Sequence, residues 1–284
     1  MRASSPQNSG DGKRLAAAIV ALSLSAIPAA FAAEAAAKPT RQSWSFAGPF
    51  GLYDRAQLQR GFKVYREVCA ACHGLKLVAF RTLASPGGPG FTEPQAKQVA
   101  SEYRITDGPN ERGEMFERPG QLSDFIPSPD PNEQAARARL NGALPPDLSV
   151  IAKARSYEVG FPGFIIDAFK QYQESGVDYV YAYLTGYENP PAGTTLPVTQ
   201  FWNKYFPGNR TAMRPPFQKD QIDYPDGTPQ TPEQYSKDVT AFVMWAAEPH
   251  LEARKRIGFQ VMIFLLVFAG LMYFTKKKVW SAVH

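Results

Sequence analysis

Apolar residues recur at steps of three and four between Asp54 and Cys72, which predicts an amphipathic helix over that stretch. The apolar face consists of Leu58, Phe62, Tyr65, Cys69 and Cys72. Asp54 precedes this face and has a side chain suited to capping the first turn. Gly61 lies in the middle, where glycine costs about 1 kcal/mol relative to alanine. We therefore expect another helix to cross close to Gly61.

A second apolar face after Thr231 predicts the crossing partner. Residues 231–234 read Thr-Pro-Glu-Gln, which is a capping box with proline at the first helical position. The face that follows consists of Tyr235, Val239, Phe242, Val243 and Ala246. We expect this C-terminal helix to pack across the N-terminal one.

The segment between these two helices is irregular. Residues 84–95 contain Gly-Gly-Pro-Gly and are predicted to form a loop. Short helices are predicted at Glu133–Asn141 and Val177–Thr185, each followed by a glycine. No stretch alternates convincingly between apolar and polar residues, and the chain has 25 Pro and 22 Gly. These features predict a mainly α domain with long loops.

The N-terminal residues have the pattern of an export signal. A basic pair precedes thirteen uncharged residues from Leu15 to Ile27, and Ala30-Phe31-Ala32 has the form of a cleavage site. We expect residues 1–32 to be removed and the mature chain to start at Ala33. The alternative is an uncleaved N-terminal anchor.

The last long apolar run predicts a membrane anchor. Residues 257–274 are uncharged and would form about 27 Å of helix, enough to cross a hydrocarbon core. The three lysines at 276–278 favour a cytoplasmic C-terminus, in agreement with an exported N-terminal side. The expected organisation is a periplasmic domain at 33–253, followed by an anchor and short tail at 254–284. A buried core helix is the alternative for the apolar run.

The sequence Cys69-Ala70-Ala71-Cys72-His73 is the attachment motif of c-type haem. Two thiols at this spacing can bond to the two vinyl groups of the porphyrin, and the adjacent imidazole can bind the iron. The chain has only two cysteines, so none remain for a disulfide framework. The alternatives are a chance match or a redox dithiol.

An iron atom bound by His73 needs a sixth ligand, an open site or water. The candidate side chains outside the signal and the span are His250, His284, Met115, Met213 and Met244. Met213 precedes Pro215 and Pro216, where a rigid backbone could present the thioether. The residues alone favour Met213 and leave open that it only fills the core.

The predicted periplasmic domain is acidic, although the whole chain carries a net charge of +5. Residues 33–253 contain 22 Lys and Arg against 25 Asp and Glu, and the acids are concentrated in 93–133 and 220–238. An acidic face near the haem would attract a basic partner. The alternative is a solvated acidic surface without a partner.

Ordered motifs run through the chain from Trp44 to Trp280. They include RGFKVY at 60–65, DGPN at 107–110, GEMF at 113–116, NGALPPDLS at 141–149, YFPG at 205–208, DGTP at 226–229 and WAAEP at 245–249. With these motifs and its haem motif, the chain resembles the cytochrome c1 family, the haem subunits of the cytochrome bc1 complex.

The resemblance implies a c-type cytochrome fold with long loop insertions, one C-terminal transmembrane helix and one covalently attached haem c. It implies that Met213 is the distal iron ligand opposite His73. It also implies a set of residues that line or support the pocket: Asn141, Ala143, Pro145, Pro146, Arg155, Tyr179 and Phe206. Arg155 is suited to pairing with a haem propionate.

The function that the resemblance implies is electron transfer, with no substrate bond broken by this subunit. The expected partners are cytochrome b, a Rieske iron–sulfur protein as electron donor and a soluble cytochrome c as acceptor, with no nucleic acid. The expected location is the bacterial inner membrane, single-pass, with the haem domain in the periplasm. The alternatives are a haem c subunit of another oxidoreductase, such as a terminal oxidase, and a haem enzyme or sensor with an open distal site.

One departure from compact family members is a longer connection at 156–176. Its apolar residues predict an extra amphipathic helix: Phe164, Ile165, Ala168, Phe169 and Tyr172. We expect this helix to pack against its own domain.

Overall fold

The computed structural model describes residues 36–157, 160–169 and 175–281. The predicted signal at 1–32 lies outside the described residues. The helices are α2 (Arg55–Glu67), η1 (Cys69–Ala71), η2 (Phe80–Ala84), α3 (Glu93–Ser101), α4 (Glu133–Arg139), α5 (Ile151–Ala154), α6 (Gly163–Phe169), α7 (Ser175–Thr185), α8 (Pro232–Ala247) and α9 (Leu251–Trp280). The strands are β1 (Leu75–Ala79), β2 (Arg104–Asp107), β3 (Phe116–Pro119), β4 (Phe125–Ile126), β5 (Phe201–Trp202) and β6 (Arg210–Thr211).

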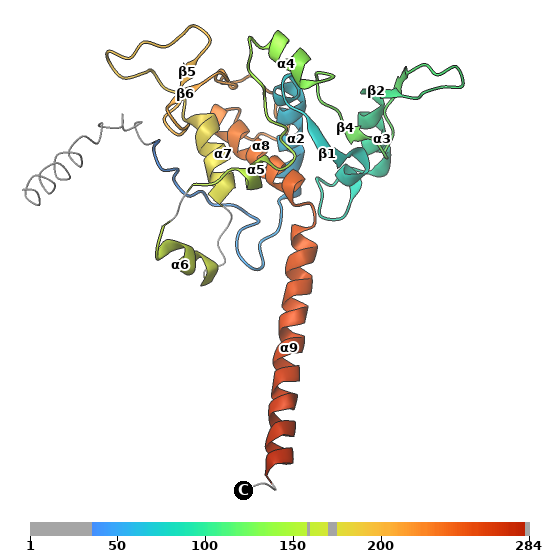
Figure 1. The fold of residues 1–284 in the computed structure, drawn as a ribbon, viewed down its shortest axis with the longest axis vertical. Helices are drawn as coiled ribbons and strands as arrows, with labels where there is room; N and C mark the ends of the chain where they lie inside the picture. Colours follow the sequence, from blue (N-terminus) through green and yellow to red (C-terminus); the bar gives the residue numbers. More distant parts are fainter. Residues whose placement is uncertain (1–35, 158–159, 170–174, 282–284) are drawn as a thin grey trace, which may run out of the picture. The chain divides into compact units, whose positions relative to one another are not determined.

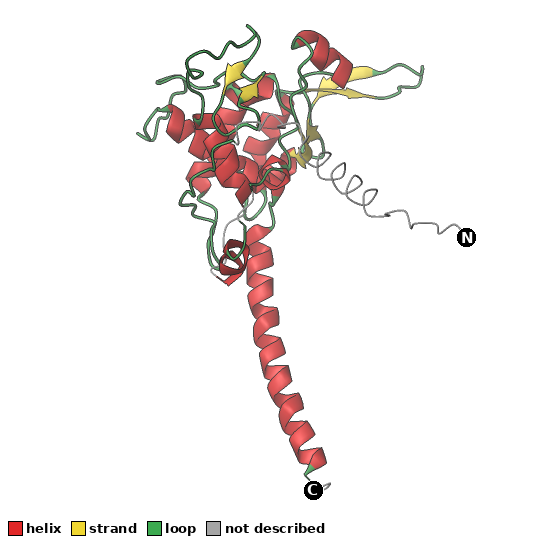
Figure 2. Ribbon diagram, turned by 60° about the vertical axis from the view of Figure 1, so that its left-hand side comes forward, coloured by secondary structure: helices red, strands yellow, loops and turns green. Residues whose placement is uncertain are grey.

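The described part of the chain is mainly helical, as predicted, but it contains strands that the sequence did not reveal (Figures 1 and 2). They form three two-stranded antiparallel pairs, β1 with β4, β2 with β3 and β5 with β6. Each strand has two to five residues, too few to produce a clear alternating pattern. The strands therefore serve as short hydrogen-bonded connections between loops.

The core is organised around the crossing of α2 and α8, which lie against each other (Figure 1). A Cβ atom on Gly61 would lie 2.1 Å from the carbonyl oxygen of Asp238 and 2.6 Å from Cβ of Phe242. Only glycine permits this approach, so the predicted close crossing is confirmed. Phe62 packs on Phe242 at a ring-centroid distance of 5.5 Å.

Polar side chains fix the register of the same crossing. The carboxylate of Asp238 is fully buried and accepts hydrogen bonds from Gln57 and Gln234 (Nε2 at 3.2 and 2.8 Å) and from Arg60 (Nε at 3.0 Å). Arg60 also contacts Asp226 at 2.8 Å. Burial opposes the charge of Arg60, but the two carboxylates raise its pKa above the usual value. The ion pair between Arg60 and Asp226 joins the motif at 60–65 to the motif at 226–229.

Several predicted boundaries were wrong. The short helix α4 ends at Arg139 rather than Asn141, and α7 begins at Ser175 rather than Val177. Asp54 caps α2 as predicted, accepting from the backbone N–H groups of Ala56 and Gln57. However, α2 ends at Glu67 rather than Cys72, because the haem motif turns into η1. The helix α3 starts inside the predicted loop, where Thr92 and Gln95 form a complete capping box.

The anchor helix α9 is long and apolar enough to cross a membrane. It begins at Leu251, six residues before the apolar run, and only three residues separate it from α8. Its first turns contact the domain. Glu252 pairs with Arg55 at 2.8 Å, and Nζ of Lys255 donates to the carbonyl oxygens of Phe46 and Gly51 at 2.6 and 3.1 Å.

The longer connection at 156–176 contains a helix, as predicted, in the form of α6. Asp167 of α6 is buried and forms an ion pair with Arg41. The predicted Tyr172 lies outside the described residues.

Candidate functional site

The haem motif forms a tight turn at the end of α2. The backbone N–H groups of Cys72 and His73 both donate to the carbonyl oxygen of Cys69, at 3.0 and 2.9 Å. The hydroxyl of Tyr65 donates to the carbonyl oxygen of His73 at 3.1 Å. Burial raises the pKa of the Cys69 thiol to about 12, which keeps it protonated. The turn therefore holds both thiols of the motif next to one imidazole.

The imidazole of His73 is oriented by the loop between α4 and α5. Its Nδ1 lies 2.8 Å from the carbonyl oxygen of Pro146. A carbonyl only accepts, so Nδ1 donates and Nε2 keeps its lone pair. Burial lowers the pKa of His73, although the bond to Pro146 and the charge of Asp147 oppose this. The result is a neutral imidazole with Nε2 available to a metal.

Asp147 fixes the loop that carries the Pro146 carbonyl. Its carboxylate accepts from the backbone N–H groups of Lys76 at 3.0 Å and Ser149 at 2.9 Å. The N–H of Leu148 donates to the carbonyl oxygen of Gly74 at 2.9 Å. A Cβ atom on Gly74 would lie 3.0 Å from Asp147 Oδ2, so a larger residue at position 74 would crowd the Asp147 carboxylate. The position of the carbonyl that orients His73 thus depends on Asp147.

Met213 lies after β6 in a group of aromatic side chains. The hydroxyl of Tyr187 donates to the Met213 carbonyl oxygen at 3.1 Å, and the Met213 N–H donates to Thr211 Oγ1 at 3.2 Å. The hydroxyls of Tyr183 and Thr211 are 2.7 Å apart. The hydrogen bonds to Tyr187 and Thr211 therefore fix the backbone position from which the Met213 side chain extends.

The predicted pocket residues Tyr179 and Phe206 belong to the same aromatic group. The ring of Tyr183 stacks on Tyr179 at 6.3 Å and contacts Phe206 at 5.8 Å. Burial raises the pKa of Tyr179, and the charge of Arg155 partly opposes this. Arg155 is itself exposed. The structure therefore brings Tyr179 and Phe206 together around Tyr183 and leaves the Arg155 guanidinium accessible.

The predicted residues Asn141, Ala143 and Pro145 lie with Pro146 on the loop between α4 and α5. Asn141 adopts a left-handed backbone with φ of 52°, which turns the chain out of α4. Its side chain is exposed, and within residues 36–157, 160–169 and 175–281 no hydrogen bond joins it to His73 or Met213. Only Pro146 of this loop contacts the imidazole through a hydrogen bond.

These residues fit a haem better than a bare metal ion. No cluster of three or more His, Cys, Asp or Glu side chains suitable for a metal occurs in the described ranges. The donors predicted from the sequence are one imidazole nitrogen, two thiols at the attachment spacing and one thioether, which is the set that c-type haem uses.

Sequence reasoning missed Tyr183, Tyr187 and Asp147. Tyr179 and Tyr183 are four residues apart on α7, which is the spacing of one helix face, and Tyr187 follows at the same spacing just beyond the end of that helix. That spacing could have predicted that the ring of Tyr183 contacts the rings of the other two tyrosines. Asp147 lies inside the motif at 141–149, but it is not among the pocket residues that the sequence predicts.

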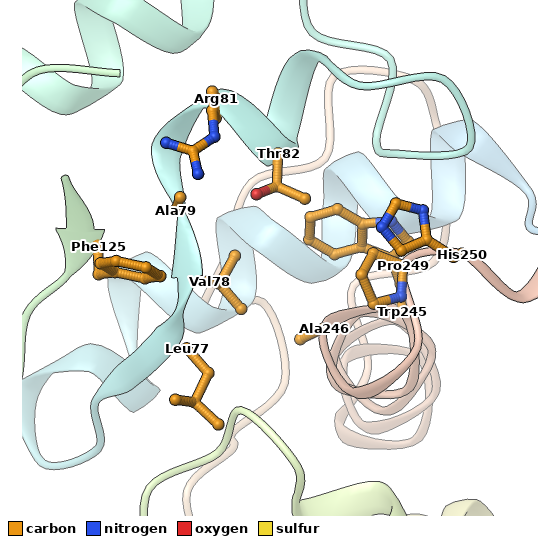
Figure 3. Close-up of a pocket in the computed structure, with 10 residues that line it drawn as sticks. All are labelled: Leu77, Val78, Ala79, Arg81, Thr82, Phe125, Trp245, Ala246, Pro249 and His250. Atoms are coloured by element: carbon orange, nitrogen blue, oxygen red, sulfur yellow. The ribbon is translucent and has the colours of Figure 1, made fainter. Parts of the chain in front are cut away.

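A separate cavity of about 200 Å³ lies where β1 and η2 face the end of α8 (Figure 3). Leu77, Val78 and Thr82 line one side, and Trp245 and His250 line the other. None of the predicted haem residues is among its lining residues. His250 is therefore part of a different surface from His73.

Comparison with known proteins gives a consistent assignment. A model of the Cytochrome C1 family matches residues 44–283. The chain is 60% identical to a cytochrome b/c1 of Bradyrhizobium diazoefficiens over 93% of its own length and 39% of that relative. It is 51% identical to cytochrome c1 of Blastochloris viridis, covering 86% of this chain and 87% of the relative. It is 45% identical to the mitochondrial cytochrome c1 heme protein of Saccharomyces cerevisiae, covering 85% and 72%. The chain therefore belongs to the cytochrome c1 family.

Proposed function

We propose that the protein is the haem subunit of a cytochrome bc1 complex. It takes one electron from a Rieske iron–sulfur protein and passes it to a soluble cytochrome c. The observation that supports this most directly is the His73 imidazole, oriented through Nδ1 by Pro146 and adjacent to both thiols. The relative named cytochrome b/c1 supports cytochrome b as a partner.

Four side chains would hold the haem in this proposal. Cys69 and Cys72 would form the thioether links, while His73 Nε2 and the Met213 sulfur would bind the iron. Covalently attached haem c supplies a one-electron iron couple. As an iron ligand, Met213 would raise the potential of such a couple and close the iron to small ligands. Arg155 would neutralise a propionate.

The membrane arrangement is part of the same proposal. Residues 33–253 would form the periplasmic domain of a protein of the bacterial inner membrane, with residues 1–32 removed. The helix α9 would be its single span, and the lysines at 276–278 would lie on the cytoplasmic side.

The test is Met213→Leu, with Met115→Leu as a matched control. Met115 is an exposed residue on the loop between β2 and β3. In the full complex, Met213→Leu is expected to lower the midpoint potential and to let carbon monoxide bind the reduced form, while Met115→Leu changes neither. An unchanged potential in Met213→Leu would show that another residue is the ligand.

A further inference from the structure

A loop of the domain reaches the membrane-spanning part of α9. Residues 47–52 read Ala-Gly-Pro-Phe-Gly-Leu and contain no charged side chain. Phe50 and Leu52 are 73% and 58% exposed. Large apolar side chains exposed together on one loop indicate a surface for a protein or a membrane.

The loop is fixed at a defined depth along α9. The ring of Phe50 contacts the ring of Phe259 at a centroid distance of 5.8 Å. Phe259 is the third residue of the uncharged run that starts at Ile257. Lys255 holds the two ends of the loop through the carbonyl oxygens of Phe46 and Gly51. Phe50 therefore lies level with residues that enter the hydrocarbon region.

The helix α6 lies at the same level as the first turns of α9 (Figures 1 and 2). Ile165 and Ile166 are exposed on it. Asp167 is the only charged residue of α6, and it is buried against Arg41. The solvent-facing side chains described for α6 are thus apolar at the depth where the loop meets the anchor.

We propose that loop 47–52 and α6 insert into the lipid interface beside α9, as a second contact of the domain with the bilayer. Phe50 and Leu52 enter the boundary between headgroups and acyl chains, and Ile165 and Ile166 rest on it. Interfacial segments bury an apolar face at the boundary between headgroups and acyl chains and keep their charged side chains on the other face. Arg256, which is exposed one turn earlier on α9, would lie at the height of anionic headgroups. This assigns α6, the described helix of the longer connection, a contact with the membrane in addition to its ion pair with Arg41 of the domain.

The experiment is photocrosslinking of the full chain in its native membrane. The photoreactive residue p-benzoylphenylalanine replaces Phe50, Leu52 or Ile166 in separate variants. The control is the same replacement of Val198, which is 98% exposed on the loop before β5. After illumination, mass spectrometry of the purified chain identifies each adduct. Lipid adducts are expected at positions 50, 52 and 166 with yields at least tenfold above those at position 198.

Two outcomes would overturn the proposal. Adducts with another polypeptide at these positions would show that the patch is a protein interface. Lipid adducts as rare as at position 198 would show that the patch faces water. The haem absorption spectrum of each variant checks folding, and the result does not depend on which residue binds the iron, because none of the four positions belongs to the proposed pocket.

Discussion

Replacing Gly61 by alanine tests the packing that carries the haem motif. The new methyl group would lie 2.1 Å from the Asp238 carbonyl oxygen and 2.6 Å from Phe242 Cβ. Ordinary contacts begin at 3.4 Å, and the closest neighbour is backbone, so the helices must separate by roughly 1 Å. Such overpacking typically costs about 1–3 kcal/mol, and the gain from better helix propensity is at most about 1 kcal/mol. The upper part of that range applies, because the separation also strains the hydrogen bonds of Asp238.

A net loss of about 2 kcal/mol would lower Tm by roughly 4–8 °C for a domain of this size. The assay is thermal unfolding of the detergent-solubilised chain by circular dichroism, at one scan rate for all variants. Gly258→Ala is the matched control, since Gly258 is also helical and no heavy atom lies within 4 Å of the place that its new methyl group would take. A Gly61→Ala protein with an unchanged or higher Tm would refute the close crossing as a source of strain.

Three further predictions concern the whole protein. Mass spectrometry should find a mature chain starting near Ala33 with one covalent haem; haem released by acid–organic extraction would contradict attachment. Charge reversal at the exposed residues Glu111, Glu114 and Glu117 should slow electron transfer to a basic cytochrome c at low salt and flatten its ionic-strength dependence, and salt-independent rates in the parent protein would exclude acidic docking. A chain ending after Arg256 should be water-soluble with an unchanged haem spectrum, because it keeps the contacts of Glu252 and Lys255 with the domain, although it loses that of Phe259; loss of haem would show that the span belongs to the fold.

The parts of the fold that the sequence predicted depend on interactions between residues close together in the chain. Asp54 and Thr231 cap their helices, and Gly61 marks a crossing because an interior helical glycine needs a reason. The missed start of α3 also had a local signal, since Thr92 and Gln95 repeat the pattern of Thr231 and Gln234. The sequence could therefore have predicted it.

The parts that could not be predicted depend on residues far apart in the chain. The partner of His73 Nδ1 is a backbone carbonyl 73 positions away, and a carbonyl has no residue-type signal. The capping box predicted at the start of α8 is only half formed. Thr231 accepts from the backbone N–H of Gln234, but the Gln234 side chain donates to Asp238 at 2.8 Å instead of bonding back to Thr231. Competition of this kind, between two partners for the same side chain, can be recognised only once the helices are packed together.

The short link between α8 and α9 determines how the domain can move on its anchor. Glu248 lies in that link and pairs with Lys153 of α5 at 2.5 Å and with Arg254 of α9, and the Tyr53 hydroxyl donates to its carbonyl oxygen at 3.2 Å. These three contacts restrict rotation of the domain relative to α9. A haem attached to the end of α2 would consequently keep one tilt relative to the bilayer normal. Partners on either side would then meet it at a constant height and angle.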